Sequence, residues 1–221
     1  MKEIDIEIGK SEGLNFLQIL FDFKQYYDSI DPVVLIDDLI RSSFPLRAGA
    51  LALQGHQLPR RICLGDHHSL VAEDFNRSIV AGCTSSTSLA KAQVNDILVQ
   101  CKAAVEKPKE KGFVEKWNQH VDDVSLLLIG TTGFIHEVVS KKVPAFIKAA
   151  FAKRLTISTK TAVVSSSKDN LEAAKLVLAA SNVAVEQQPG DIVQDLGGQR
   201  AIKRRTQVIK GRFAKAKRGV K

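Results

Sequence analysis

The sequence predicts an α+β protein in which an antiparallel sheet packs on helices. Apolar runs of strand length alternate with segments whose apolar residues recur at helical spacing, but without the regularity of βαβ units. With 221 residues, of which 44% are hydrophobic and 25% charged, the chain can bury one sizeable core and has the composition of a globular protein. We therefore expect one domain, with room for a short appendage.

The first part of the chain is expected to begin with a buried strand, because Leu14 to Phe23 is a dense apolar run. Asp31-Pro32 has the pattern of a helix N-cap followed by proline in the first turn. A second helix is expected from Leu46 to Leu53, closed by Gly55. Arg60 to Leu64 predicts another strand, followed by a turn.

The middle of the chain is expected to form a loop, a helix and a hairpin. Gly82 to Ser88 is rich in small polar residues and predicts a loop, which leads into a helix from about Leu89 to Ala104. Trp117 to Val121 and Val124 to Ile129 are apolar runs around the acidic pair Asp122-Asp123. That pattern is typical of a β-hairpin with the acids at its tip.

The last part predicts two more helices and several short strands. One helix is expected from Gly133 to Ala152, with a kink at Pro144, and another is expected to begin at Ser167 or Asp169. A turn is expected at Thr159-Lys160. The expected short strands are Leu155 to Ile157, Ala162 to Ser165, Val183 to Val185 and Ile192-Val193.

The positive charge of the chain is concentrated at its C-terminal end. The net charge is +8, and Gln199 to Lys221 contain ten Lys or Arg and no Asp or Glu. The other 198 residues hold 22 basic and 24 acidic groups and are nearly neutral. Such a segment suits a polyanion, because each neutralised phosphate releases counterions; a solvated tail and a localisation signal are the alternatives. We divide the chain into a domain over residues 1–198 and a basic segment over residues 199–221.

The sequence disfavours secretion and membrane insertion. No apolar run approaches the roughly 18 residues needed to cross a membrane, and Met1 to Lys10 lack the apolar core of a signal peptide. The three cysteines, Cys63, Cys83 and Cys101, lie far apart and give no disulfide framework. We therefore expect an intracellular protein, in the nucleus or the cytoplasm, without a membrane partner.

A zinc site is one interpretation of a small group of cysteine and histidine residues. Cys63, His67 and His68, with His56 upstream, supply suitable ligand types but lack paired CxxC or HxxxH spacing. Ordinary polar or core roles are therefore favoured for them.

Three acids stand at the ends of apolar runs. Asp22 ends the first expected strand, and Asp122-Asp123 interrupt the expected hairpin. Because a carboxylate is costly to bury without a partner, such acids need a counter-charge, and Mg²⁺ prefers oxygen ligands of this kind. Two ions about 4 Å apart can activate a 3′-hydroxyl and stabilise a pyrophosphate leaving group. The alternative is that Asp122-Asp123 form a solvated turn, in which Asp is common.

Five segments resemble, in order and spacing, the palm motifs of reverse transcriptases of the non-LTR and group II intron kind. Phe21 to Asp31, Phe-Asp-Phe-Lys-Gln-Tyr-Tyr-Asp-Ser-Ile-Asp, is similar to the first motif. His120 to Leu127 resembles the Tyr-x-Asp-Asp hairpin, with His120 in the place of the aromatic residue. The other three are Gly82 to Leu89 at the Gly-x-Pro-Gln-Gly-Ser-x-Leu motif, Leu155 to Thr161 at the Lys-Thr motif, and Asp195 to Gly197 at the Leu-Gly turn.

The resemblance implies the palm of an RNA-directed DNA polymerase that uses Mg²⁺ or Mn²⁺, an RNA template, a DNA primer and deoxynucleoside triphosphates. It implies Asp22 and Asp122 as catalytic metal ligands, with Asp123 beside them. Tyr27 would exclude a ribose 2′-hydroxyl by sterics, and Lys160 would approach the triphosphate, unless it is simply an exposed turn residue. The other residues implied in nucleotide binding are Phe23, Ser85 and Ser86. The residues of the basic segment expected to bind nucleic acid are Arg200, Lys203, Arg204, Arg205, Lys210 and Arg212.

The chain departs from the family where activity depends on detail. Gln25 stands where the first motif has lysine, and Thr84-Ser85-Ser86 replaces Pro-Gln-Gly, whose last two residues lie against template and nucleotide. Only 21 residues precede Asp22, so the fingers region is expected to be largely absent. The resemblance therefore implies a diverged or fragmentary palm with weak or lost polymerase activity.

Two other functions stay open. One is a non-catalytic nucleic-acid-binding module that keeps the palm fold and the basic segment, which the changed motif at Ser85-Ser86 and the missing fingers favour. The other is a palm-type nucleotidyltransferase or cyclase that acts on free nucleotides. The basic segment disfavours this third function, because a small substrate needs no strip of ten positive charges.

Overall fold

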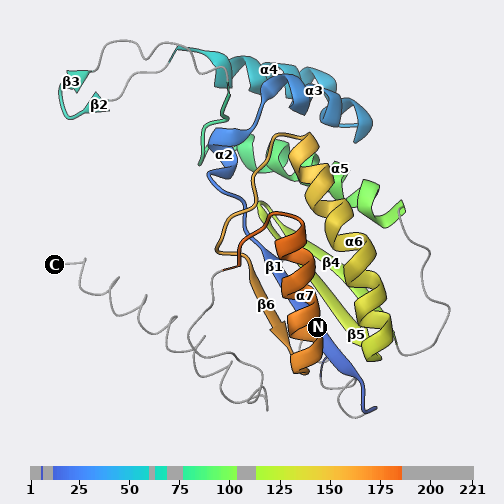
Figure 1. Ribbon diagram of the computed structural model, residues 1–221. Helices are drawn as coiled ribbons and strands as arrows, with labels where there is room; N and C mark the ends of the chain where they lie inside the picture. The colour runs from blue at the N-terminus through green and yellow to red at the C-terminus, as the bar shows by residue number, and fades with distance from the viewer. Residues whose placement is uncertain (1–5, 7–11, 60–62, 69–76, 104–112, 186–221) are drawn as a thin grey trace.

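The computed structural model describes Ile6 and residues 12–59, 63–68, 77–103 and 113–185. In these residues a four-stranded antiparallel sheet, in the order β4-β5-β1-β6, packs against helices (Figure 1). The sheet strands are β1 (Asn15–Phe21), β4 (Val114–His120), β5 (Asp123–Gly130) and β6 (Ala162–Ser165), and a separate hairpin consists of β2 (Cys63–Leu64) and β3 (His67–His68). The helices are α2 (Tyr26–Ser29), α3 (Pro32–Arg41), α4 (Leu46–Gln57), α5 (Ser86–Ala103), α6 (Thr132–Ala152) and α7 (Lys168–Ala180). The predicted α+β class is confirmed.

The two faces of the sheet carry different apolar clusters. Leu17 and Ile19 of β1 are fully buried in the main core, to which α5, α6 and α7 also contribute. Figure 1 shows α6 and α7 lying across this face of the sheet. Phe16 and Leu127 belong to a smaller cluster on the opposite face, because side chains alternate along a strand. β1 and β5 are thus apolar on both faces, as the dense run from Leu14 predicted for β1.

Two helices begin with side-chain caps. Asp31 Oδ1 accepts a hydrogen bond from the backbone N–H of Val33 at 2.9 Å, with Pro32 next in the chain, which confirms the predicted start of α3. Thr131 caps α6 by accepting from Phe134 N–H at 3.3 Å, so this helix begins slightly before the expected Gly133 and continues through Pro144.

Four charged side chains join α3, α5 and the C-terminal end of α6 inside the protein. Lys153 Nζ forms ion pairs with Asp38 and, at 2.8 Å, with Asp96. The guanidinium of Arg41 lies 2.5 Å from Asp38 and 3.1 Å from Asp96. The two acids and the lysine are buried, whereas the Arg41 side chain is 49% exposed. We call these four residues the buried ion cluster.

The start of α5 differs from the sequence-based expectation. Ser85 C=O accepts from Leu89 N–H at 3.0 Å, and the helix begins at Ser86 rather than at Leu89. The second half of the expected loop is therefore helical, since Ser and Thr are favoured at helix starts as well as in loops. Gly55 likewise lies inside α4 rather than at its end.

Two expected strands are shorter or wrong, and a third is described only in part. Of the segment Leu155 to Ile157, only Ile157 forms an isolated bridge, to Phe23. Val183 to Val185 is not a strand, because the Val183 N–H instead bonds to the Leu178 carbonyl at 2.9 Å and closes the end of α7. Only Cys63–Leu64 of the strand expected at 60–64 is described. The expected strand Ile192-Val193 and the whole basic segment lie outside the described residues.

Candidate cation site at one end of the sheet

The three acids singled out in the sequence lie at one end of the sheet. β1 and β5 pair up to Phe21 opposite Val124, and Asp22 and Asp123 are the next residues beyond this pair. Asp122 directly precedes Asp123, in the two-residue turn between β4 and β5. The antiparallel register therefore brings together acids that are 100 residues apart in the sequence. We call Asp22, Asp122 and Asp123 the sheet-end carboxylates.

Side-chain alternation directs Asp22 and Asp123 to the same face. Phe21 and Phe23 both enter the main core, so Asp22 between them points to the opposite face. Asp123 is four residues from Leu127, which belongs to the smaller cluster on that opposite face. The two carboxylates thus leave the sheet on the face that α6 and α7 do not cover.

Negative charge accumulates at the sheet-end carboxylates. The pKa of Asp123 is raised, first by partial desolvation of its carboxylate and then by the charges of Asp122 and Asp22, while His120 opposes the shift. In the described part of the chain, no lysine or arginine forms an ion pair with any of the three acids. Asp22 and Asp122 are half-buried and Asp123 is exposed, so an ion from solvent can reach them.

The donor set fits a divalent cation of the Mg²⁺ or Mn²⁺ class. Carboxylate oxygens are the ligands that such ions prefer. The positive charge of a bound ion would offset the repulsion from Asp122 and Asp22 that, after desolvation, contributes to the raised pKa of Asp123. Among residues 12–59, 63–68, 77–103 and 113–185, however, no three His, Cys, Asp or Glu side chains are already gathered into a metal-binding group. The sheet-end carboxylates therefore lie at the same end of the sheet without forming a complete metal-binding group.

Two unusual backbone conformations flank these acids. Val121, the first residue of the turn between β4 and β5, has a φ of 59°, and Gln25, just before α2, has a φ of 47°. A β-branched residue rarely adopts positive φ, and the first central position of a two-residue hairpin turn of this kind usually holds glycine. Four other non-glycine residues of the described part also have positive φ, namely Ser43, Ser78, Arg154 and Asn182, so this conformation is not confined to this end of the sheet.

A turn between α6 and β6 is bonded to the backbone of Asp22. Ser158 N–H donates to the Asp22 carbonyl at 2.7 Å, and the Asp22 N–H donates to Thr161 Oγ1 at 3.4 Å. The turn predicted at Thr159-Lys160 is confirmed, and the Lys160 side chain on it is exposed. Lys160 is therefore an exposed residue of the turn that is hydrogen-bonded to the Asp22 backbone.

The aromatic residues predicted at the nucleotide site have different environments. The Phe23 side chain is 5% exposed and its ring lies 5.3 Å from that of Tyr26, so it belongs to the core and only its backbone can face a nucleotide. Tyr27 is half-buried on α2, with its ring edge-on to Tyr26 at 5.6 Å. The Tyr26 hydroxyl donates to the Ala90 carbonyl of α5 at 2.8 Å, and its pKa is raised by burial and by the charge of Asp122. Tyr26 is thus a core residue that is hydrogen-bonded to α5 and is affected by the charge of Asp122.

Of the two serines predicted to contact nucleotide, Ser86 is turned inward at the start of α5 and Ser85 is half-buried just before it. Ser86 is fully buried, and its hydroxyl donates to the Val80 carbonyl. Ser85 Oγ lies 3.3 Å from Nε2 of His56, whose Nδ1 accepts from the Val80 N–H at 3.1 Å. The Ser86 side chain therefore cannot contact a nucleotide in this arrangement, whereas Ser85 is half-buried and its hydroxyl also lies 3.3 Å from the exposed Cys83 Sγ.

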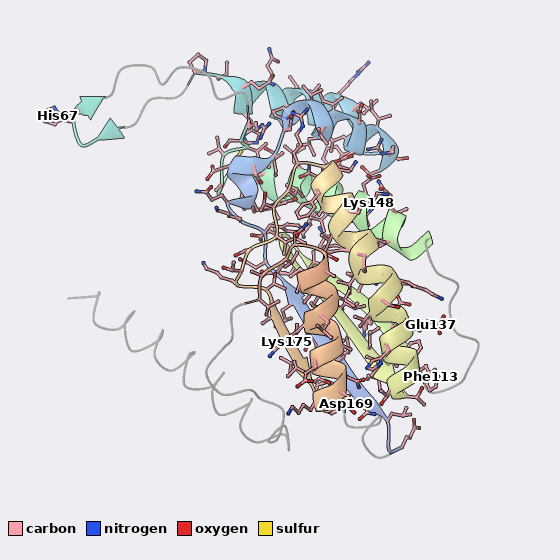
Figure 2. All side chains as sticks on the ribbon, in the orientation of Figure 1. His67, Phe113, Glu137, Lys148, Asp169 and Lys175 are labelled. Atoms are coloured by element: carbon pink, nitrogen blue, oxygen red, sulfur yellow. The ribbon has the colours of Figure 1, made fainter. Side chains whose placement is uncertain are left out.

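The cysteine and histidine residues considered for zinc are separated. His56 is buried in α4, whereas Figure 2 shows His67 at the end of the β2–β3 hairpin, away from that helix. Cys63 and His68 are cross-strand partners in this hairpin. Cys83 and Cys101 are free thiols, one exposed and one buried.

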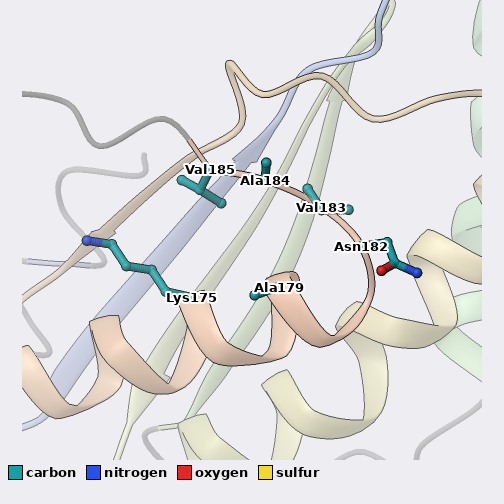
Figure 3. A pocket seen from close by; sticks show the side chains of 6 residues that line it. All are labelled: Lys175, Ala179, Asn182, Val183, Ala184 and Val185. Carbon is teal, nitrogen blue, oxygen red and sulfur yellow. The ribbon is translucent and has the colours of Figure 1, made fainter.

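A surface hollow of about 460 Å³ lies away from the predicted site residues (Figure 3). Its lining combines the C-terminal half of α7 with the segment after it: Lys175, Ala179, Asn182, Val183, Ala184 and Val185. Lys175 is its one charged lining residue in the described part of the chain, and no acid or nucleophile faces it there. The hollow therefore offers no catalytic group.

Two parts of the predicted site belong to the C-terminal end of the chain. The basic residues Arg200, Lys203, Arg204, Arg205, Lys210 and Arg212 lie outside the described residues, as does the Leu-Gly turn at Asp195 to Gly197.

None of the helices in the described residues is both long and apolar enough to cross a bilayer.

The sequence matches no protein-family model and no curated protein.

Three contributors to this end of the sheet were not found from the sequence: Tyr26, Ser158 and Thr161. Tyr26 is adjacent to the predicted Tyr27, and Ser158 and Thr161 bracket the predicted turn at Thr159-Lys160, so their proximity in sequence was the available signal. What the sequence does not show is that this turn folds back onto Asp22.

Proposed function

We propose that this chain is a reverse-transcriptase-type palm, an RNA-directed DNA polymerase domain of retroelement type. One observation supports the proposal above the others: Asp22 and the Asp122-Asp123 pair lie at the same end of an antiparallel sheet. No lysine or arginine of the described residues forms an ion pair with them. These are also the acids that the resemblance implies as catalytic. Polymerase chemistry by metal-assisted transfer needs carboxylates in this relation.

In the proposed mechanism Asp22 and Asp122 would hold Mg²⁺ or Mn²⁺, with Asp123 beside them. The bound ions would supply the positive charge that activates a primer 3′-hydroxyl and stabilises the pyrophosphate leaving group. Lys160 would place an ammonium group near the triphosphate, and the Tyr27 ring would exclude a ribose 2′-hydroxyl. The bonds from Ser158 and Thr161 would fix Asp22 before substrate arrives.

A non-catalytic nucleic-acid-binding palm is the second candidate. The observation that favours it is the inward orientation of Ser86, which is fully buried where the resembled motif has a glycine against the nucleotide. In this version the fold and the basic segment bind nucleic acid, while the nucleotide side of the site is closed.

The test is extension of a DNA primer on an RNA template with Mg²⁺ or Mn²⁺. We expect weak extension by the wild-type chain and none by Asp122→Ala, because removing a metal ligand costs more than any change around it. Asp169→Ala is the matched control, since Asp169 is an exposed acid at the start of α7 (Figure 2), near the opposite end of β1. This control should extend the primer as the wild type does.

The outcomes separate the two candidates. If the wild-type chain stays at the level of Asp122→Ala while it still binds the duplex, the binding-module candidate is favoured. If Asp122→Ala extends the primer as well as the wild type, the assigned site is wrong or another polymerase is present in the preparation.

The basic segment gives a separate prediction about nucleic-acid binding. A chain that ends at residue 198 lacks the ten basic residues of the segment and should bind an RNA–DNA duplex more weakly, with a flatter salt dependence. Each lost phosphate contact should reduce the slope of log K against log salt by roughly 0.7–0.9. Unchanged affinity and slope in fluorescence anisotropy titrations would show that the segment has another role.

A further inference from the structure

The backbone of Asp22 lies between the continuous β1–β6 ladder and the isolated bridge from Phe23 to Ile157. The last β1–β6 pair is Leu20 opposite Ala162, so Asp22 lies beyond the ladder on this side. Its two backbone polar groups are taken over by the turn before β6: Ser158 N–H donates to the Asp22 carbonyl, and Thr161 Oγ1 accepts from the Asp22 N–H. The position of this acid therefore depends on the segment 157–161 as well as on the pairing of β1 in the sheet.

Thr161 makes two hydrogen bonds, one within the turn and one to Asp22. Its N–H donates to the Ser158 carbonyl at 3.1 Å, which closes the turn, and its hydroxyl accepts from the Asp22 N–H at 3.4 Å. The residue is 1% exposed, so water cannot readily replace the hydroxyl. Loss of the hydroxyl would leave the Asp22 N–H without its partner and would loosen the link between the turn and the Asp22 backbone.

We propose that Thr161 is a positioning residue that fixes the Asp22 carboxylate for cation binding by holding the Asp22 backbone N–H. The inference rests on the proposed function, because it assigns Asp22 to a divalent cation. Groups that orient a metal ligand affect affinity without contacting the metal, and their loss commonly weakens binding by about 10–100-fold. The 3.4 Å bond is long, so we expect the lower end of this range.

The obvious alternative is that Thr161 only stabilises the pairing of β1 with β6. Ser165 provides a matched control for this alternative. It is also 1% exposed, and its hydroxyl donates to the Phe16 carbonyl of β1 at 2.9 Å, at the other end of the same strand pair. Ser165→Ala thus removes this bond between β6 and β1, together with the acceptor of the Ser167 N–H at 3.2 Å, without touching the sheet-end carboxylates.

The experiment is titration of the full chain with Mn²⁺ alone, with free Mn²⁺ followed by electron paramagnetic resonance. Thr161→Val keeps the shape of the side chain and should weaken Mn²⁺ binding about tenfold. Thr161→Ser keeps the hydroxyl and should bind within about twofold of the wild type. Ser165→Ala should bind as the wild type does, and Asp22→Asn should lose the site.

Amide hydrogen exchange gives a second measurement that does not depend on the metal. Exchange of the Asp22 amide should accelerate in Thr161→Val and stay unchanged in Thr161→Ser and Ser165→Ala. If Thr161→Val does not fold, the same two measurements on Thr161→Ala replace it, with circular dichroism as the check of folding.

The failures of the two proposals are distinguishable. Wild-type Mn²⁺ binding by Asp22→Asn would overturn the proposed function, and the role of Thr161 with it. Loss of binding in Asp22→Asn together with wild-type binding in Thr161→Val would overturn the positioning role alone. Equal weakening in Thr161→Val and Ser165→Ala would also overturn that role, because it would show a general effect of strand pairing.

Discussion

The buried ion cluster and the sheet-end carboxylates are two groups of acids with opposite surroundings. In the first group Lys153 and Arg41 pair with both acids, whereas no lysine or arginine of the described residues pairs with the second. Burial tends to raise the pKa of Asp96, but hydrogen bonds from Lys153 and Arg41 outweigh it and the pKa is lowered. The pKa of Asp123 is raised instead, by burial and then by the neighbouring acids.

The two groups therefore differ in pairing: the acids of the buried ion cluster form ion pairs with lysine and arginine side chains, and the sheet-end carboxylates do not among the described residues. The buried ion cluster connects α3, α5 and α6 and has no access to a ligand, so its role is structural. Even there the match is imperfect: Asp38 Oδ2 has no hydrogen-bond partner among the described residues, and burial keeps the pKa of Asp38 raised despite Lys153. Charge that stays uncompensated at an accessible edge is instead available for a cation from solution.

The largest expected effect is the loss of the lysine at the centre of the buried ion cluster. Lys153→Met leaves Asp38 and Asp96 buried with only the half-exposed Arg41, and breaking such a buried pair costs roughly 3–5 kcal/mol of unfolding free energy. Urea denaturation at neutral pH measures this loss, and Mn²⁺ affinity should not change. A loss below about 1 kcal/mol would show that the cluster is solvated rather than buried.

A smaller effect is expected for the second cation of the same cluster. Arg41→Gln removes a side chain that is 49% exposed, so solvent screens most of its interaction, and Lys153 still holds both acids. The unfolding free energy should fall by about 1 kcal/mol or less. If urea denaturation shows that Arg41→Gln costs as much as Lys153→Met, burial is not what distinguishes the two cations.

The smallest effect is expected at the sheet end, as a change in pH dependence. The pKa of Asp123 is raised in the folded chain, so just above the unfolded value of about 3.9 the folded state binds more protons, and stability falls as the pH rises. Asn does not titrate, so Asp123→Asn should be the more stable chain above this window and lose its advantage as the pH is lowered toward about 4. Parallel pH profiles of the two chains in urea denaturation would contradict the raised pKa.

Local features of the fold could be predicted from the sequence better than its long-range contacts. The Asp31 cap and the hairpin around Asp122-Asp123 depend on neighbouring residues, and both are present. The return of the turn at Thr159-Lys160 onto Asp22 depends on register across about 140 residues, which no local pattern encodes. Asp38 is an intermediate case, because it lies on the apolar helix face of Leu35 and Leu39, and an acid at such a position predicts a buried counter-charge.

The candidate site was predictable to the same degree. The acids at Asp22 and Asp122 stand at the ends of apolar runs, and this pattern together with the family resemblance was sufficient to single them out. The inward orientation of Ser86 was not, because a serine at the start of a helix and a serine in a binding loop have the same local sequence. Tertiary contacts with Val80 and His56 decide between the two.

The central claim is that the sheet-end carboxylates take a divalent cation which the fold itself does not supply. The most direct test is the urea midpoint of the wild-type chain with and without Mg²⁺ at equal ionic strength, beside the double variant Asp22→Asn with Asp122→Asn. The wild type should be stabilised in proportion to the logarithm of Mg²⁺ concentration once the site is occupied, by about 1.4 kcal/mol for each tenfold increase. The double variant should not respond. Equal responses in the two chains, or none in the wild type, would contradict the claim.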